Sequence, residues 1–402
     1  RGSKKNIQNF GGDPYGITLF GTDAGAASIH YLLMSEKANY LFNRAILQSG
    51  SAYSPWALQT NVFERTRNFL TNLNLVEKDS LKPEVRLTTY NFTKFSTDDL
   101  YKAAQKVITE DDKSRQLNSV FVPVIEHESS KKPIVNDTIQ KQMSSMKTKK
   151  IKWRPIIIGF NSEEGGQLFC NDPNFNSNWF NKENIEKYLP ADVSYTLNKK
   201  IDTQTVYEKI HEEFIPGYND TLEQIYVKLK GDLWYMYPVY RTAVEMAQNT
   251  DRFQVYFYRF SSNEKMGKLM CTDKKDKKDK KVEGANHGDE TQYLFNQNTL
   301  QEKFKTVSQK VIKLWTQFAK HGNPTVNHNW PNDWINPNTL YNLWKKIDST
   351  NDPEYFDLDK FKMQKLESSE FSRKLLWTKV YEAVQKRKDE REKRKQEEKT
   401  KS

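Results

Sequence analysis

Residues 17–28 read ITLFGTDAGAAS and carry the clearest fold signal in the chain. An apolar run that favours β structure leads into Gly-x-Asp-x-Gly, and small helix-forming residues follow. This is the layout of a nucleophile elbow, where a strand turns sharply into a helix and presents one side chain at the turn. Gly21 and Gly25 suit such a turn because the backbone is strained and the helix packs closely on the strand. The elbow residue here is Asp23, where a serine nucleophile is expected.

The rest of the chain alternates between strand-like and helix-like patterns. This alternation predicts an α/β fold, with a mostly parallel sheet covered by helices on both faces. The predicted strands are residues 17–20, 45–48, 153–159 and 253–260. The predicted helices are residues 24–34, 62–72, 97–107, 184–189, 203–214, 222–248 and 300–321.

Further motifs follow one another along the chain. They are residues 6–14 (NIQNFGGDP), 41–51 (LFNRAILQSGS), 55–57 (PWA), 121–125 (FVPVI), 155–165 (PIIIGFNSEEG), 284–290 (GANHGDE) and 315–324 (WTQFAKHGNP). Together with the elbow, they resemble the type-B carboxylesterase and cholinesterase family, which implies the α/β-hydrolase fold. Members carry a long segment before the elbow, with the first strands and a Gly-Gly oxyanion loop. Only twenty-two residues precede Asp23 here, so we expect a fragment that lacks its N-terminal strands.

The resemblance also implies the remaining site residues. Glu164 takes the position of the family's triad acid and His287 that of its histidine, in the chain order nucleophile, acid, histidine. The amide of Ala24, directly after the elbow residue, is the residual oxyanion donor. In a working triad the histidine takes the serine proton and the acid orients the imidazole. Asp23 has no hydroxyl group whose proton His287 could take.

A carboxylate at the elbow changes the chemistry that is available. Attack by Asp23 on an ester would give an anhydride, whereas attack at a saturated carbon would give an ordinary ester that His287-activated water could open. Two carboxylates beside His287 also favour an ion-pair network without turnover. A metal ion bound by Asp23, Glu164 and His287 is less favoured than these two possibilities, because no further His or Cys stands at ligand spacing. We expect neither a metal nor a cofactor.

These considerations lead us to expect that the chain is not an enzyme. The expected function is that of a catalytically inactive cholinesterase-like protein in extracellular adhesion or protein–protein binding, resembling glutactin, neurotactin and the neuroligins. The expected partner is then a protein at the cell surface or matrix. Two alternatives stay open: an α/β-hydrolase with an aspartate nucleophile for epoxides or alkyl halides, and a binder of hydrophobic esters that does not hydrolyse them.

The net charge of +11 is concentrated in two low-complexity stretches. Residues 273–281 carry six Lys and three Asp, and residues 385–402 carry nine Lys or Arg and five Asp or Glu. Such runs are typical of solvated loops and tails, and no nucleic-acid motif accompanies them, so we expect no nucleic-acid partner. The predicted organisation is a partial carboxylesterase domain over residues 1–384, with a Lys-rich loop at 264–283. A charged tail, helical or disordered, follows at 385–402.

Apolar residues recur at helical spacing over residues 371–384. In the cholinesterases a C-terminal helix of this kind pairs two subunits, so we expect either a homodimer through this helix or packing on its own domain.

Several features bear on the cellular compartment. The chain has two cysteines, Cys170 near the acid and Cys271 near the histidine, and these loops converge in the resembled fold. They are therefore expected either to form a disulfide or to be two free thiols. N-glycosylation sequons begin at Asn91, Asn136 and Asn219. With the family's secretory character these predict a secreted or extracellular protein. No run of eighteen apolar residues occurs, so no membrane span is predicted.

Overall fold

The computed structural model describes most of the chain. The described residues are 1–59, 61–77, 90–127, 129–146, 151–172, 175–176, 178–181, 184–190, 193, 201–214, 220–248, 254–262, 270–272, 279–282, 284–295, 300–325, 344–347 and 353–401. Most of the predicted Lys-rich loop and Asn219 lie outside them. Within the loop, the short strands β5 (Met270–Thr272) and β6 (Asp279–Lys281) pair in antiparallel fashion.

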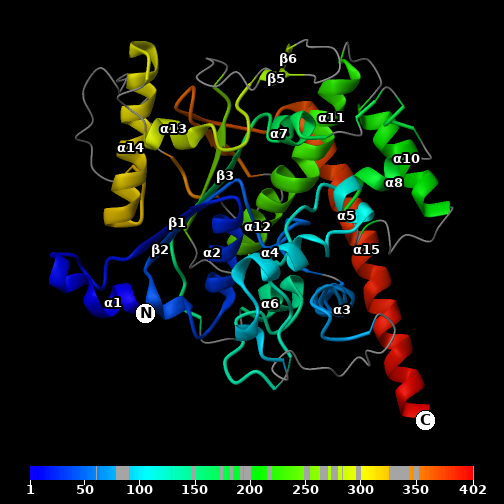
Figure 1. The fold of residues 1–402 in the computed structure, drawn as a ribbon. Helices are drawn as coiled ribbons and strands as arrows, with labels where there is room; N and C mark the ends of the chain where they lie inside the picture. The colour runs from blue at the N-terminus through cyan, green and yellow to red at the C-terminus, as the bar shows by residue number, and fades with distance from the viewer. Residues whose placement is uncertain are drawn as a thin grey trace.

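A six-stranded sheet runs through the centre of the molecule in the order β1-β2-β3-β4-β7-β8 (Figure 1). The strands are β1 (Thr18–Thr22), β2 (Arg44–Gln48), β3 (Ile156–Asn161), β4 (Val255–Phe260), β7 (Tyr355–Asp357) and β8 (Lys362–Gln364). The first five strands in this order are parallel, and β8 closes the series as an antiparallel neighbour of β7. The predicted α/β class with a mostly parallel sheet is confirmed.

Helices cover both faces of this sheet, as Figure 1 shows for α2 and α12 on one side and α13 and α14 on the other. The α-helices from the N-terminus to the centre are α1 (Gly2–Asn6), α2 (Ala24–Met34), α3 (Val62–Asn72), α4 (Thr97–Gln105), α5 (Glu110–Ser114), α6 (Ile139–Ser145), α7 (Gly166–Cys170) and α8 (Ile185–Tyr188). Those that follow are α10 (Ile201–Phe214), α11 (Leu222–Gly231), α12 (Tyr237–Gln248), α13 (Glu290–Phe295), α14 (Glu302–His321) and α15 (Ser368–Lys401).

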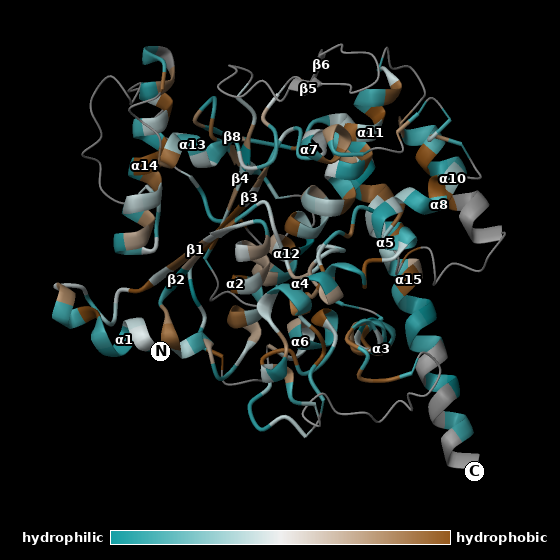
Figure 2. Cartoon of the chain, viewed as in Figure 1, coloured by the Kyte–Doolittle hydropathy of each residue, from teal (hydrophilic) through white to brown (hydrophobic). Residues whose placement is uncertain are grey.

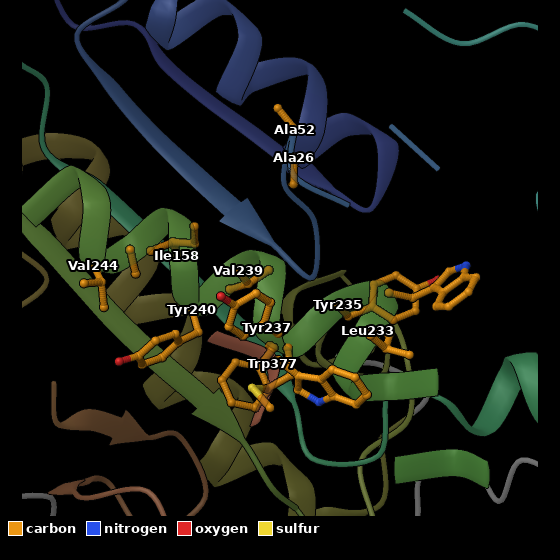
Figure 3. Close-up of a cluster of buried hydrophobic side chains, with 14 of the residues drawn as sticks. Ala26, Ala52, Ile158, Leu233, Tyr235, Tyr237, Val239, Tyr240, Val244 and Trp377 are labelled. Carbon is orange, nitrogen blue, oxygen red and sulfur yellow. The ribbon is translucent and has the colours of Figure 1, made fainter. Parts of the chain in front are cut away.

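Two hydrophobic cores lie on opposite faces of the sheet. Every residue of β3 and β4 is buried, as expected of central parallel strands whose both faces are covered. Alternate residues divide between the cores: Ile156 and Ile158 face the larger one, and Ile157 faces the smaller one. These strands are brown in Figure 2. Figure 3 shows part of the larger core, with side chains from α2, α12 and α15.

One predicted helix is interrupted at its middle. The pattern over residues 222–248 predicts a single helix, but α11 and α12 are joined by a π-helical turn at Asp232–Met236. Such turns are frequent at functional sites because the extra residue displaces the side chains around it. Here the turn carries Tyr235, which lies beside the candidate site described below.

The predicted apolar stripe and charged tail form one continuous helix, α15. Trp377, Val380 and Val384 belong to the larger core, so the stripe packs on its own domain. α15 extends past the body of the molecule, and the coloured residues of this part are mostly teal in Figure 2. A homodimer through this helix stays a prediction. Among the described residues, no helix combines the length and apolar character needed to cross a membrane.

Candidate active site

Asp23 occupies a strained corner between β1 and α2. Its φ of 55° and ψ of −119° form a backbone conformation that residues other than glycine rarely adopt. The corner is tight, because a Cβ added at Gly21 would lie 2.6 Å from the carbonyl carbon of Gly25. A Cβ at Gly50, directly after β2, would meet the carbonyl oxygen of Asp23. The small residues around the elbow thus allow β1, β2 and α2 to approach one another.

The Asp23 side chain is not committed to the helix that it precedes. Asp23 is the N-cap residue of α2, yet its carboxylate makes no capping hydrogen bond. The amide of Ala24 belongs to the first turn of α2, where N–H groups have no intrahelical acceptor. Negative charge is favoured at this end of a helix. The carboxylate and a neighbouring donor therefore stand together at the carboxyl end of β1.

Glu164 follows strand β3 and is held by several donors. Its Oε1 accepts a hydrogen bond from the Ser49 hydroxyl at 2.5 Å and from the Asn161 amide at 2.6 Å. Its Oε2 lies 2.7 Å from Nδ1 of His287. Because its side chain is 1% exposed, the carboxylate has a fixed direction.

His287 lies in the loop before α13, and this loop is tied to the one that carries Glu164. Glu163 and Asn286 form an isolated parallel bridge, with the Glu163 amide donating to the carbonyl of Ala285 at 2.8 Å. The ring of Tyr235 covers the imidazole, with 4.3 Å between the ring centroids. His287 thus has Glu164 on one nitrogen and an aromatic ring on one face.

The structure brings the three predicted triad positions together. Nε2 of His287 lies 3.6 Å from Oδ1 of Asp23, on the side of the ring opposite Glu164. The exposed fractions of the side chains are 45% for Asp23, 11% for His287 and 1% for Glu164. A buried His–Glu pair therefore stands behind an accessible carboxylate, which is the arrangement of a nucleophile, a base and an orienting acid.

The electrostatics of the site favour a protonated histidine. Burial alone would lower the pKa of His287, but Glu164 and Asp23 outweigh it and raise the pKa from 6.5 to about 9. The ion-pair network expected from the sequence is therefore present, with His287 as the cation between Asp23 and Glu164. Burial also raises the pKa of the neighbouring Asp289 to about 6.

Three supporting residues were not predicted from the sequence. Ser49 and Asn161 position Glu164, and Tyr235 covers His287. Asn161 also donates to the carbonyl of Asn286 at 2.6 Å and to the carboxyl of Glu290 at 2.5 Å. For Ser49 and Asn161 the available signal was their position at the carboxyl ends of β2 and β3, where parallel strands of such sheets place functional side chains. Tyr235 lies in the π-helical turn and had no such signal.

The remaining predicted residues lie away from this cluster. Cys170 at the end of α7 is disulfide-bonded. The side chain of Cys271 is outside the described residues, so its pairing with Cys170 stays a prediction. Asn91 and Asn136 are both exposed, as a glycan acceptor must be. Within the part of the chain that is described, no group of three or more His, Cys, Asp and Glu residues could hold a metal ion.

Comparisons with known proteins place this geometry in a family. The family model of the carboxylesterases matches residues 4–388. The chain is 26% identical to Esterase B1 of Culex pipiens, covering 80% of this chain and 58% of that protein. It is 26% identical to the bile salt-activated lipase of Bos taurus, covering 86% of this chain and 56% of that protein. It is 27% identical to carboxylesterase 5A of Homo sapiens, covering 81% of this chain and 52% of that protein. The chain thus spans little more than half the length of these relatives.

A solved structure shares the fold. The chain superposes on juvenile hormone esterase from Manduca sexta, solved with OTFP covalently attached, with a TM-score of 0.71. The match covers 94% of this chain and 68% of the esterase, at 23% sequence identity. The α/β-hydrolase fold predicted from the resemblance is confirmed.

The expectation that the chain is not an enzyme is wrong. The similar proteins, which are members of the same family, are named esterases and lipases. The prediction gave the loss of the serine hydroxyl too much weight. His287 lies between Asp23 and Glu164, 3.6 Å from the first and 2.7 Å from the second, and a carboxylate can itself act as a nucleophile. By the match of its family model over nearly the whole length, the chain belongs to the carboxylesterase family.

Proposed function

We propose that this protein is a hydrolase in which Asp23 is the nucleophile, acting on small electrophiles at a saturated carbon, epoxides first among them. The observation that carries the proposal is the accessible Asp23 carboxylate, 3.6 Å from a histidine that a buried glutamate orients. A cluster that served only to hold loops together would not need its outermost carboxylate to be 45% exposed.

The nature of the nucleophile selects the substrate class. Attack of Asp23 on a carboxylic ester would produce an anhydride, which is less stable than the ester that formed it. Attack on an epoxide carbon produces an alkyl ester, an ordinary covalent intermediate. The strain of the three-membered ring supplies driving force for this step. Epoxides therefore fit an aspartate at the elbow better than the esters for which a serine is suited.

In the first step, the Asp23 carboxylate forms a bond to the epoxide carbon and the carbon–oxygen bond of the ring breaks. The electron pair goes to the departing oxygen, which needs a proton. With a pKa of about 9, His287 is protonated at neutral pH and its Nε2–H faces Asp23. His287 therefore gives its proton to this oxygen, and the products of the step are a hydroxyalkyl ester and a neutral imidazole.

In the second step, neutral His287 takes a proton from water, and the resulting hydroxide adds to the carboxyl carbon of the Asp23 ester. The bond from that carbon to the alkyl oxygen then breaks, and this oxygen receives the proton from His287. Alkylation has removed the negative charge of Asp23, one of the causes of the raised pKa of His287, so the imidazole becomes a better base when a base is needed. The diol leaves, and Asp23 returns its own proton to His287.

The other functions expected from the sequence have less support. A purely adhesive role does not explain a carboxylate, a histidine and a glutamate in reactive geometry, and the similar proteins are named esterases and lipases. We also propose an extracellular location. The disulfide at Cys170 and the exposed sequon residues Asn91 and Asn136 support it, since disulfides persist in oxidising compartments.

The direct test is turnover of an aryl epoxide, with diol formation followed by chromatography. The wild-type protein is expected to form diol, and Asp23→Asn is expected to lose this activity. Asp98→Asn is the matched control, because Asp98 is an exposed helical aspartate whose salt bridge is with Lys102 and not with a residue of the Asp23 site. If Asp23→Asn forms diol as fast as wild type, or if wild type only binds the epoxide or an ester without converting it, the proposal is wrong.

A further inference from the structure

The π-helical turn Asp232–Met236 contacts both loops that carry the site. Directly before the turn, Gly231 lies against Gly165, the residue after the orienting acid. A Cβ added at Gly165 would lie 2.8 Å from the amide nitrogen of Gly231. Within the turn, the ring of Tyr235 covers the imidazole of His287, with 4.3 Å between the centroids and 30° between the ring planes. A displacement of this turn therefore affects the surroundings of the acid and of the histidine together.

The first residue of the turn is bound to the C-terminal helix. Asp232 is buried, and its Oδ2 accepts a hydrogen bond from Nε of Arg373 at 2.7 Å. The same oxygen accepts from Nε1 of Trp377 at 3.3 Å, and Oδ1 accepts from Nη2 of Arg373 at 3.5 Å. Both donor residues belong to α15 and are buried as well. We call Asp232, Arg373 and Trp377 the α15 anchor.

The π-helical geometry allows one short turn to contact two different neighbours. Asp232 and Tyr235 are three positions apart, and in an α-helix such residues lie on the same face. The wider ring of a π-helix turns the chain less per residue, so the two side chains diverge more. Asp232 contacts α15, and Tyr235 contacts His287 on the site. The α15 anchor thus holds the turn from outside.

The anchor is buried, so its loss has consequences for the turn. When one partner of a buried ion pair is removed, the remaining charge has no counterpart, and the structure is strongly destabilised there. Without Arg373, the carboxylate of Asp232 gains solvation only if the turn that begins with it shifts. Tyr235 belongs to the same turn and moves with it.

We propose that Arg373 is a positioning residue: through Asp232 it fixes the π-helical turn and so keeps the ring of Tyr235 over His287. Arg373 touches no reacting atom. The inference rests on the proposed function for the task of His287 in the reaction. The positioning itself is a property of the folded protein and does not require turnover.

Positioning and direct electrostatics predict opposite changes at His287. The charged groups that act on its pKa are Glu164, Asp23 and Glu290, and none of them belongs to α15. The loss of a cation such as Arg373 would by itself raise this pKa or leave it unchanged. Displacement of the covering ring instead lets water screen the three carboxylates, so the pKa falls from about 9 towards the ordinary 6.5.

The test is NMR of the histidine ring signals of the full chain without substrate, recorded over a range of pH. The His287 signal is the one that is absent from His287→Gln. Arg373→Met removes the donors and keeps a long side chain, and the pKa of His287 is expected to fall by about 1 in this variant. The upfield shift that the Tyr235 ring gives the His287 ring protons is expected to shrink. Arg373→Lys keeps a cation beside Asp232 and is expected to retain most of both properties.

Glu370→Gln is the matched control. Glu370 is a buried residue of the same helix, but its salt bridge of 2.9 Å is with Arg259 of β4 and not with the turn. This variant is expected to lower the melting temperature, as Arg373→Met does, and to leave the His287 signals unchanged. If Arg373→Met does not fold, Trp377→Phe removes only the indole donor of the anchor. It is then expected to shift the same signals in the same direction by a smaller amount.

Turnover of an aryl epoxide gives a second readout. The single-turnover rate of wild type is expected to fall above pH 9, and in Arg373→Met this fall is expected to begin about one pH unit lower. If wild type forms no diol, the proposed function fails, and the NMR measurement still decides the positioning role. The inference is overturned if the His287 signals of the folded anchor variants match those of wild type, or if the pKa rises. It is equally overturned if Glu370→Gln moves these signals as much as Arg373→Met does.

Discussion

The substitution Asp23→Asn imitates the alkylated state of the site, because it removes the charge of the carboxylate while keeping its size. We predict that the pKa of His287 falls from about 9 in this variant. At the 3.6 Å between Nε2 and Oδ1, the charge interaction is about 1.2 kcal/mol at the dielectric constant of water and about 4.6 kcal/mol at a value near 20. These energies correspond to a decrease of about 1 to 3 in pKa.

The lower end of this range is expected, since the Asp23 side chain is 45% exposed and solvent screens its charge. The assay is an NMR titration of the His287 ring in wild type and variant. Glu164→Gln is expected to lower the pKa further, because Glu164 is buried and lies 2.7 Å from Nδ1. Asp98→Asn is the control and is expected to change nothing. A pKa of His287 that is the same in wild type and in Asp23→Asn would refute the proposed coupling, and with it the switch of His287 from acid to base.

Two further predictions concern the same site, and a third concerns the buried Lys230. Ring opening by wild type needs protonated His287, so single-turnover rates are expected to fall about tenfold per pH unit above pH 9; a rate that rises there would contradict the acid role. Asp23→Ser is expected to give a burst of nitrophenol with a nitrophenyl ester, because Glu164 and His287 are in place; no burst from the folded variant would mean that His287 is misplaced. Lys230 is fully buried over Trp234, and burial lowers its pKa from 10.5 to about 7. Lys230→Met is therefore expected to raise the free energy of unfolding by up to about 5 kcal/mol at pH 6. This gain shrinks as the pH rises from 7 to 10.5, because the lysine of the folded chain is then already neutral and that of the unfolded chain becomes neutral. Urea titrations at several pH values measure the gain, and a gain that grows with pH would contradict the prediction.

Local sequence patterns predicted the regular elements well. The bounds of α2 and α3 match the predicted helices at 24–34 and 62–72. The prediction of α2 came from the small helix-forming residues after the elbow, and that of α3 from its apolar period. The four longer strands were placed correctly to within a few residues. The strands β7 and β8 were missed, since three residues are too few to show a pattern.

The site was predictable only in part, for a physical reason. Its three main residues came from motifs that resemble a family, whereas the contacts that support them join distant parts of the chain. Ser49 reaches Glu164 across 115 positions, and no local pattern encodes that hydrogen bond. The π-helical turn that brings Tyr235 over His287 looks like ordinary helix in the sequence. The error about enzymatic activity arose in the same way. The residue type at position 23 was known from the sequence, but the exposure of the Asp23 carboxylate and its contact with His287 were not.

The proposed hydrolysis requires a covalent bond between the Asp23 carboxylate and the substrate. One turnover of an aryl epoxide in water enriched in heavy oxygen, followed by mass spectrometry of the peptide that contains Asp23, detects this bond. We expect the label to enter the Asp23 carboxylate, because water adds to its carboxyl carbon, and the first diol released to be unlabelled. Label found in that first diol and absent from Asp23 would show that water attacks the epoxide itself and that Asp23 is not the nucleophile.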